Sequence, residues 1–253
     1  MSPNKNVLRP RTVGWFSCGA ASAVAIKLAL QEDSDLVPTY CETGAEHPDN
    51  GRFLTDCETW FGKSIGRIRS QTYQTTWDVW ARRKYLSGIK GAPCSVEMKV
   101  VPRLAYQRPN DLHVFGYTAD PNDVARYRRF QLNYPELHVR APLVQQHLTK
   151  VDCLAIIRGA NIRIPHMYEL GFQNNNCIPC VKATSPAYWS LVRRHFPDHF
   201  KKMAKLSRRL GVRLSRINNE RIFIDEIPND YPTSRLTSRP CDFLCNIAEK
   251  IAL

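Results

Sequence analysis

Two closely spaced cysteine pairs are the residues of this chain with the most evident capacity for chemistry. They are Cys177-Ile178-Pro179-Cys180 and, much later, Cys241-Asp242-Phe243-Leu244-Cys245. A short loop lets both sulfurs of a pair face the same point, so two pairs can converge on one soft metal centre. The apolar residues inside each pair would keep such a centre away from bulk water. The pattern therefore predicts a thiolate metal site.

The composition of the 253-residue chain gives these cysteines their chemical setting. Residues 1–11 are polar and basic without the apolar run of a secretory signal, and no apolar run approaches the roughly 20 residues of a membrane span. We therefore expect a cytoplasmic protein with no membrane contact. Because cytosolic thiols stay reduced, clustered cysteines favour metal binding or catalysis over disulfides. Cys57 and Cys153 stand alone in helical patterns and are expected to be small core residues.

The formal net charge of +13 is large for this length. It favours polyanionic partners such as nucleotides, tRNA or DNA. A basic surface with no particular partner is the alternative interpretation.

Strand and helix patterns alternate through the first part of the chain. Strands are expected over 13–18, 35–41, 64–70, 112–117 and 139–144, with helices over 20–31, 48–61 and 75–86. This alternation predicts an α/β fold, Rossmann-like, with a mostly parallel sheet and helices on both faces. Ligands of such sheets bind beyond the carboxyl ends of the strands.

The pattern changes after about residue 149. Thr149 is placed to cap a helix that contains Cys153, and Ser185-Pro186 to begin a long helix running to Leu210. We also expect a short strand over 221–225. The basic side chains of the long helix form either a solvated face or a nucleic-acid contact. We therefore predict an α/β nucleotide-binding domain over 1–148 and a helical, cysteine-rich region over 149–253 that packs on it and carries the metal site.

The segment Ser17-Cys18-Gly19-Ala20-Ala21-Ser22 joins the first predicted strand to the first predicted helix. Small residues let backbone N–H groups approach a phosphate, a helix start adds positive potential, and serine hydroxyls donate hydrogen bonds. Small residues also make tight turns in proteins that bind nothing, so the loop alone leaves both interpretations open.

This segment resembles the PP-loop, Ser-Gly-Gly-x-Asp-Ser, of the adenine-nucleotide α-hydrolases, which include the ATP pyrophosphatases and the sulfonucleotide reductases. Ser17, Gly19 and Ser22 match the motif. Cys18 stands in place of a glycine, and Ala21 in place of the aspartate.

Three later stretches resemble segments of the APS and PAPS reductases, in the same order. Cys41–Pro48 is similar to Asp-Thr-Gly-x-x-x-Pro-Glu, and Cys94–Pro102 to Cys-Cys-x-x-x-Lys-x-x-Pro. In the second stretch Lys99 would neutralise a phosphate or sulfate. Gly116–Asp120 and the arginines after it resemble a Gly-x-Arg segment without its first arginine.

The set is most similar to the phage and prophage proteins called PAPS reductase-like, which share the runs Trp15–Ala25 and Asn174–Lys182. The resemblance spans about residues 13–182 and implies a HUP-type fold that binds ATP, APS or PAPS. Magnesium is a further candidate ligand, at Asp120 and Asp123. The nucleotide-binding residues implied are Ser17, Cys18, Gly19, Ala20, Ala21, Ser22, Glu42, Thr43, Gly44, Gly116, Arg126 and Arg129.

In APS reductases a Cys-Cys pair and a later Cys-x-x-Cys hold a [4Fe–4S] cluster. The resemblance therefore implies a cluster on Cys94, Cys177, Cys180 and Cys245, with zinc or no metal as alternatives. Cys241 lies where the reductases carry their nucleophile, and we assign it a catalytic role beside Lys99. If both tail cysteines were ligands, Cys94 would be freed to react instead.

Three functions follow from this pattern. The first is a PAPS/APS reductase-like oxidoreductase that uses a thioredoxin-like or other electron donor; the Thr43 and Lys99 stretches favour it. The second is an ATP-dependent sulfurtransferase of the tRNA-thiolation or DNA-phosphorothioation type, favoured by the net charge and the two-cysteine tail. The third is a non-catalytic nucleotide- or nucleic-acid-binding module with structural zinc.

Overall fold

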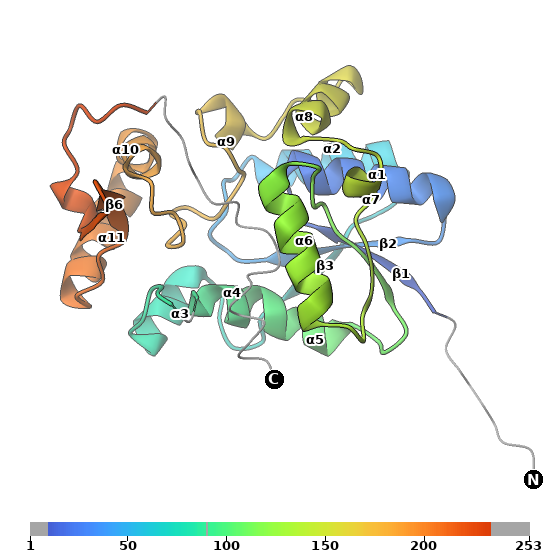
Figure 1. Ribbon diagram of the computed structural model, residues 1–253, viewed down its shortest axis with the longest axis horizontal. Coiled ribbons are helices and arrows are strands. Elements are labelled where there is room, and N and C mark those ends of the chain that lie inside the picture. Colours follow the sequence, from blue (N-terminus) through green and yellow to red (C-terminus); the bar gives the residue numbers. More distant parts are fainter. Residues whose placement is uncertain (1–9, 90, 234–253) are drawn as a thin grey trace, which may run out of the picture.

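The computed structural model describes residues 10–89 and 91–233 (Figure 1). The predicted ligand Cys245 and the predicted nucleophile Cys241 lie outside the described residues, so both assignments stay predictions.

A five-stranded, all-parallel sheet lies at the centre of the molecule, in the order β3-β2-β1-β4-β5. Its strands are β1 (Thr12–Phe16), β2 (Val37–Glu42), β3 (Gly66–Arg69), β4 (Leu112–Val114) and β5 (His138–Arg140). In register, Val13 of β1 lies between Val37 of β2 and His113 of β4. All five residues of β1 are buried, as expected for a central strand covered on both faces. The predicted α/β class with a parallel sheet is confirmed.

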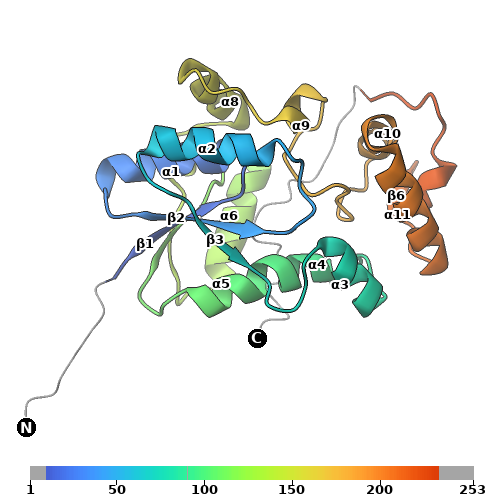
Figure 2. The same ribbon diagram turned by 180° about the vertical axis from the view of Figure 1, so that it is seen from behind.

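Helices cover both faces of the sheet (Figures 1 and 2). One face packs against α1 (Ala20–Glu32), α2 (Asn50–Phe61) and α8 (Lys150–Gly159), in an apolar core that includes Phe16 and Val114. The other face, with Val13 and Trp15, packs against Phe130 of α6 (Pro121–Asn133).

The remaining elements lie mostly off the carboxyl edge of the sheet or on its lower face (Figure 2). They are α3 (Thr76–Arg83), α4 (Pro93–Ser95), the π-helix η1 (Val96–Val100), α5 (Val101–Tyr106), α7 (Pro142–Gln145), α9 (His166–Glu169), α10 (Pro186–His195), α11 (Pro197–Arg209), the hairpin of β6 (Ser215–Ile217) and β7 (Glu220–Ile222), and the 3₁₀ turn η2 (Ile224–Glu226).

The helix cap predicted at Thr149 is confirmed. Its side chain accepts a hydrogen bond from the backbone of Asp152, whose carboxylate bonds back to the cap, forming a capping box. Cys153 on this helix and Cys57 on α2 are fully buried in the α1-side core, as expected. The division of the chain at 148/149 stays a prediction.

Two predicted elements are wrong because each was expected to continue past a proline at which the observed element ends. The expected single helix over 185–210 is two helices, α10 and α11, which break at Phe196 because Pro197 cannot continue the helical hydrogen bonds. The expected strand over 139–144 ends at Arg140, and Pro142 starts α7 instead.

Two further segments differ from the sequence-based expectation. Asp120 and Asp123 were expected in a loop. Instead, Asp120 lies at the N-cap of α6, which begins at Pro121, and Asp123 lies in its first turn. The strand expected over 221–225 ends at Ile222, and Asp225 lies in η2. No helix among the described residues is long and apolar enough to span a membrane.

Candidate functional site

The site lies where the strand order reverses. The chain passes from β1 to β2 on one side of β1, whereas β4 pairs with β1 on its other side. Such a reversal opens a crevice at the carboxyl edge of the sheet. The loop after β1, the loop after β2 and the loop after β4 all reach this edge. These three loops carry most of the residues predicted to bind the nucleotide.

Gly116, just after β4, lets the start of α1 approach the sheet closely. A Cβ at this position would lie 2.7 Å from both the backbone N and the Cα of Ser22. Any larger residue would push α1 off the end of β4. The predicted role of Gly116 in nucleotide binding is therefore accompanied by a packing role.

The phosphate loop, residues 17–22, is held together by hydrogen bonds within the loop. Ser22 Oγ accepts from the backbone N of Ser17 at 3.0 Å and donates to the carbonyl of Gly19 at 2.9 Å. Cys18 has a φ of 60°, the left-handed region that glycine adopts most readily. This conformation explains why the motif it resembles has glycine at that position.

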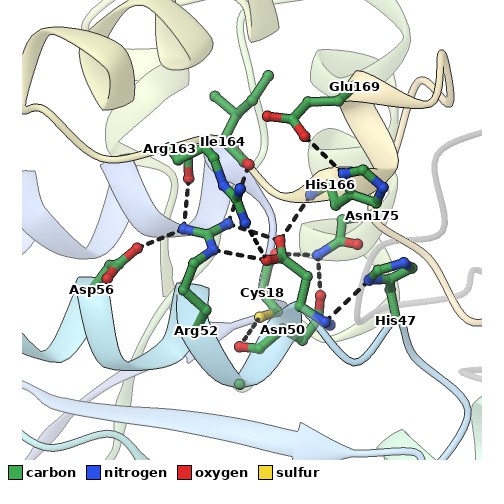
Figure 3. A network of polar contacts seen from close by, with 12 residues as sticks. Cys18, His47, Asn50, Arg52, Asp56, Arg163, Ile164, His166, Glu169 and Asn175 are labelled. Carbon is green, nitrogen blue, oxygen red and sulfur yellow. Dashed lines mark hydrogen bonds and ion pairs between the residues drawn. The ribbon is translucent and has the colours of Figure 1, made fainter.

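Asp49 ties the start of α2 to residues 163–166, and three of its partners, Arg52, Arg163 and His166, are labelled in Figure 3. Its carboxylate accepts two bonds of 2.7 Å from Arg52, one of 2.9 Å from Arg163 and one of 2.9 Å from the backbone N of His166. The Arg52 hydrogen bonds, aided by the His166 amide and Arg163, hold the pKa of Asp49 well below its ordinary range. The segment 163–169 is thereby fixed beside the phosphate loop.

A buried residue that sequence reasoning did not assign to the site, Asn175, joins the phosphate loop to the cysteine loop (Figure 3). Asn175 Nδ2 donates to the carbonyl of Cys18 at 2.6 Å and to Asn50 Oδ1 at 2.7 Å. Tyr168 also reaches the loop, where its hydroxyl accepts from the backbone N of Ala20 at 3.4 Å. The asparagine run directly before Cys177 was the available signal for Asn175.

The first Cys-x-x-Cys pair opens onto what we call the thiol pocket. Cys177 Sγ lies 3.2 Å from Thr43 Oγ1 in the loop after β2, and the backbone N of Ile178 donates to the carbonyl of Ala45 at 2.6 Å. The predicted Thr43 stretch and cysteine pair are therefore in direct contact. The pocket is lined by Thr43, Thr76, Trp80, Cys94, Ser95, Lys99, Cys177, Pro179, Cys180, Val181 and Lys182.

The thiol pocket combines cationic side chains with buried donors. Lys99 lines it at 9% exposure from the π-helix η1, a helix type that is frequent at functional sites. Lys182 is the second cation of its lining. Thr76 Oγ1 and Trp80 Nε1 are buried and have no hydrogen-bond partner within the described chain. The wall of the pocket therefore contains thiols, two lysines and two buried donors, around an inner surface that is mainly apolar.

The other cysteines within the described ranges do not line this pocket, although Cys41 Sγ lies 3.9 Å from the backbone carbonyl of Lys99. Burial raises the pKa of the Cys18, Cys41 and Cys57 thiols well above their ordinary value, and that of Cys153 to about 12. These thiols stay protonated at neutral pH and are poor nucleophiles.

Three of the predicted metal ligands, Cys94, Cys177 and Cys180, line one pocket. In the part of the chain that the structure describes, however, no group of three or more His, Cys, Asp or Glu side chains is placed to hold a metal ion. The described residues do not by themselves form the predicted cluster site. Any further ligand from Cys241 or Cys245 lies outside them.

Among the remaining predicted nucleotide-binding residues, Glu42 and Arg126 take part in local ion pairs. Glu42 lies 3.4 Å from Arg67, and Arg126 pairs with Asp123 at 2.8 Å, while Arg129 is exposed on α6. Asp123 also accepts hydrogen bonds from the backbone N and hydroxyl of Thr118.

Asp120, the other carboxylate considered for magnesium, is likewise held by protein groups. It lies 2.7 Å from the Thr118 hydroxyl, whose single proton it shares with Asp123, and accepts from the backbone N of Lys150 at 3.0 Å. Both carboxylates therefore have structural partners.

A search of protein-family models and of curated proteins finds no match to this chain.

Proposed function

We propose that the chain is an enzyme of sulfur chemistry, similar to the APS and PAPS reductases, with a HUP-type nucleotide site. The observation that carries this proposal is the contact between the cysteine loop and both nucleotide loops. Asn175 bonds the phosphate loop and Cys177 contacts Thr43, so a nucleotide at the carboxyl edge would place its anionic group beside the thiols.

The binding step uses groups on both sides of this junction. The phosphate loop offers small residues and the start of α1 to the nucleotide phosphate. Lys99, with Thr76 Oγ1 and Trp80 Nε1, offers charge and donors to the oxygens of a sulfonate group in the thiol pocket.

The reaction proposed is attack by a cysteine thiolate, assigned to Cys241, on the sulfur of the sulfonucleotide. An S–S bond forms as the S–O bond to phosphate breaks, and the electron pair leaves on the phosphate oxygen of the nucleotide. A dithiol donor of the thioredoxin class then attacks the cysteine sulfur and releases sulfite. Its second thiol frees the cysteine, and the donor leaves as a disulfide that has supplied two electrons.

Sulfite release from APS and PAPS with reduced thioredoxin tests this proposal. Lys99→Ala should lower kcat/KM by about 100-fold, since it removes a charge that stabilises the developing oxyanion. The matched control Lys201→Ala removes an equal charge from the exposed surface of α11 and should leave the rate unchanged. Absence of sulfite from folded, nucleotide-bound protein with either substrate would overturn the reductase.

The net charge of +13 favours one second candidate, an ATP-dependent sulfurtransferase that acts on tRNA or DNA. It predicts pyrophosphate release from ATP that RNA or DNA stimulates, with no sulfite from APS or PAPS. Iron and sulfide analysis of anaerobically purified protein tests the cluster in either case. A broad absorbance near about 400 nm is expected for thiolate-bound iron and sulfide, whereas colourless protein with stoichiometric zinc would exclude the cluster.

A further inference from the structure

A row of ring side chains crosses from the Asp49 segment to α3 outside the thiol pocket. We call it the aromatic strip: His166, His47, Phe196, His199 and Trp77. Successive ring centroids lie 5.1, 5.9, 6.3 and 6.3 Å apart. The five residues come from four separate parts of the chain, so the row is a product of the fold.

The strip is accessible to a partner. His199 is exposed, and His47, Phe196 and Trp77 are each partly exposed. The side chain of His166 is 39% exposed. Trp77 and Phe196 also pack against the apolar core that contains Trp189, so each presents only part of its ring to solvent.

One end of the strip adjoins the thiol pocket. The Trp77 ring packs edge-on against Trp80, a lining residue of the pocket, with centroids 5.0 Å apart. The Trp77 end of the strip therefore lies against a wall of the thiol pocket.

Cations accompany the strip along α11. Lys202 Nζ lies 4.2 Å from the centroid of the Trp77 ring, and Lys202 and Arg209, seven residues apart, share one side of the helix. Neither forms an ion pair with a described residue. On another side of α11, Arg208 is instead neutralised by Asp225 and Glu226. Asp198, in the first turn, is the acidic residue of this helix.

We propose that the aromatic strip and the α11 cations bind a single-stranded nucleic-acid segment. Ring faces stack on bases without regard to sequence, and cations that form no ion pair within the described part of the chain bind the phosphates beside them. Single strands are held by this combination. A duplex hides its base faces and would leave the strip unused. This surface goes beyond a reductase of small sulfonucleotides, because it gives the protein a polymeric partner whose bases approach the thiol pocket.

Binding of a fluorescent 12-nucleotide RNA and DNA of mixed sequence to the full-length protein tests the surface, with a 12-base-pair duplex for comparison. Trp77→Leu and His199→Ala should each weaken single-strand binding about 5- to 100-fold, as loss of a base-stacking ring does. His138→Ala, an exposed histidine on β5, is the matched control and should bind normally. Circular dichroism of each variant checks that it is folded.

The salt dependence of binding tests the cations separately. Lys202→Ala with Arg209→Ala should reduce the slope of log K against log salt by about 1.4, since each single-strand phosphate contact adds about 0.7. Lys201→Ala should leave that slope unchanged.

Equal binding of duplex and single strand, or unchanged binding by folded His199→Ala, would overturn the proposal. Binding is measured without APS, PAPS or ATP turnover. A protein that releases sulfite but binds no oligonucleotide would retain the proposed enzyme and lose this surface; the reverse result would retain the surface alone.

Discussion

The sheet core and the thiol pocket hold the same residue type in opposite surroundings. Among the described residues seven cysteines are free thiols. Cys18, Cys41, Cys57 and Cys153 are fully or almost fully buried and lie on or beside regular elements, where burial raises their pKa. The three others line a pocket with two lysines and two buried donors.

This difference shows that position, more than residue type, decides which thiols are available for chemistry. A core cysteine behaves as a small apolar residue, because burial raises its pKa more than nearby cations, such as Lys99 at Cys41, lower it. The pocket cysteines share their surroundings with Lys99 and Lys182. The predictions below change one side of this comparison at a time.

The largest expected difference is in alkylation rate. At pH 8 a thiol with a pKa of about 12, as at Cys153, is ionised to about one part in 10⁴, whereas an unperturbed thiol is substantially ionised. Cys94 is partly exposed in the pocket whereas Cys153 is fully buried, so Cys94 should react with iodoacetamide at least about 1,000-fold faster. Peptide mapping by mass spectrometry over a time course measures both rates in one sample.

Cys57 provides an internal control, since it should react as slowly as Cys153 until denaturant unfolds the chain. Comparable rates for Cys94 and Cys153 in native protein would refute the division into two environments.

Gly116→Ala should be the most damaging single change at the phosphate loop. The new Cβ would lie 2.7 Å from the backbone of Ser22, which cannot move without shifting α1, so we expect a loss of about 3 kcal/mol in the free energy of unfolding. Urea denaturation measures it. Gly51→Ala, in α2, meets nothing within 4 Å and should be neutral or slightly stabilising. A neutral Gly116→Ala would show that the loop is looser than this packing implies.

The sheet was predictable from sequence for a physical reason that the site does not share. Alternating apolar runs specify strands and helices locally, and Thr149 specified its own helix start. Contacts such as Asn175 with Cys18, 157 residues apart, depend on how the loops meet in space and leave no periodic pattern. The resemblance assigned Thr43 to the nucleotide site and Cys177 to the metal site, but it did not predict their direct contact. The break at Pro197 could have been recognised, because proline inside a helix pattern signals an end.

Acidification should weaken the sheet core through His113. Burial, with the nearby Arg103 charge, lowers the pKa of this histidine from 6.5 to about 4, and its Nδ1 accepts from Trp15 Nε1 at 3.0 Å. The neutral ring therefore contributes fully to stability above pH 6.5, and this contribution is lost as the pH falls from 6.5 toward 4. Between pH 7 and 4.5 we expect a loss of about 2 kcal/mol from this group. His113→Asn, which keeps an acceptor but does not titrate, should lose less stability over that range in urea melts. An equal loss in both proteins would contradict this role.

Asn175→Ala should uncouple the phosphate loop from the cysteine loop, with a moderate loss in the free energy of unfolding. It leaves the Cys18 carbonyl and Asn50 Oδ1 without this buried donor, which corresponds to about 1–2 kcal/mol of unfolding free energy. Weaker nucleotide binding should accompany it, because the cysteine loop no longer holds the phosphate loop. Isothermal titration with APS or ATP measures the second effect. Asn176→Ala, at the neighbouring buried position, should change binding much less.

The smallest expected effects concern two equivalent helix caps, one beside the thiol pocket and one beside the sheet core. Thr75 caps α3 and Thr149 caps α8, each in a capping box with an aspartate, so alanine at either should cost about 1 kcal/mol in urea melts. Only α3 carries Thr76 and Trp80 into the thiol pocket. Thr75→Ala should therefore also change the alkylation rate of Cys94, whereas Thr149→Ala should lower stability by the same amount and leave that rate unaltered. Equal changes in Cys94 reactivity would mean that the pocket responds to global stability rather than to the helix that forms its wall.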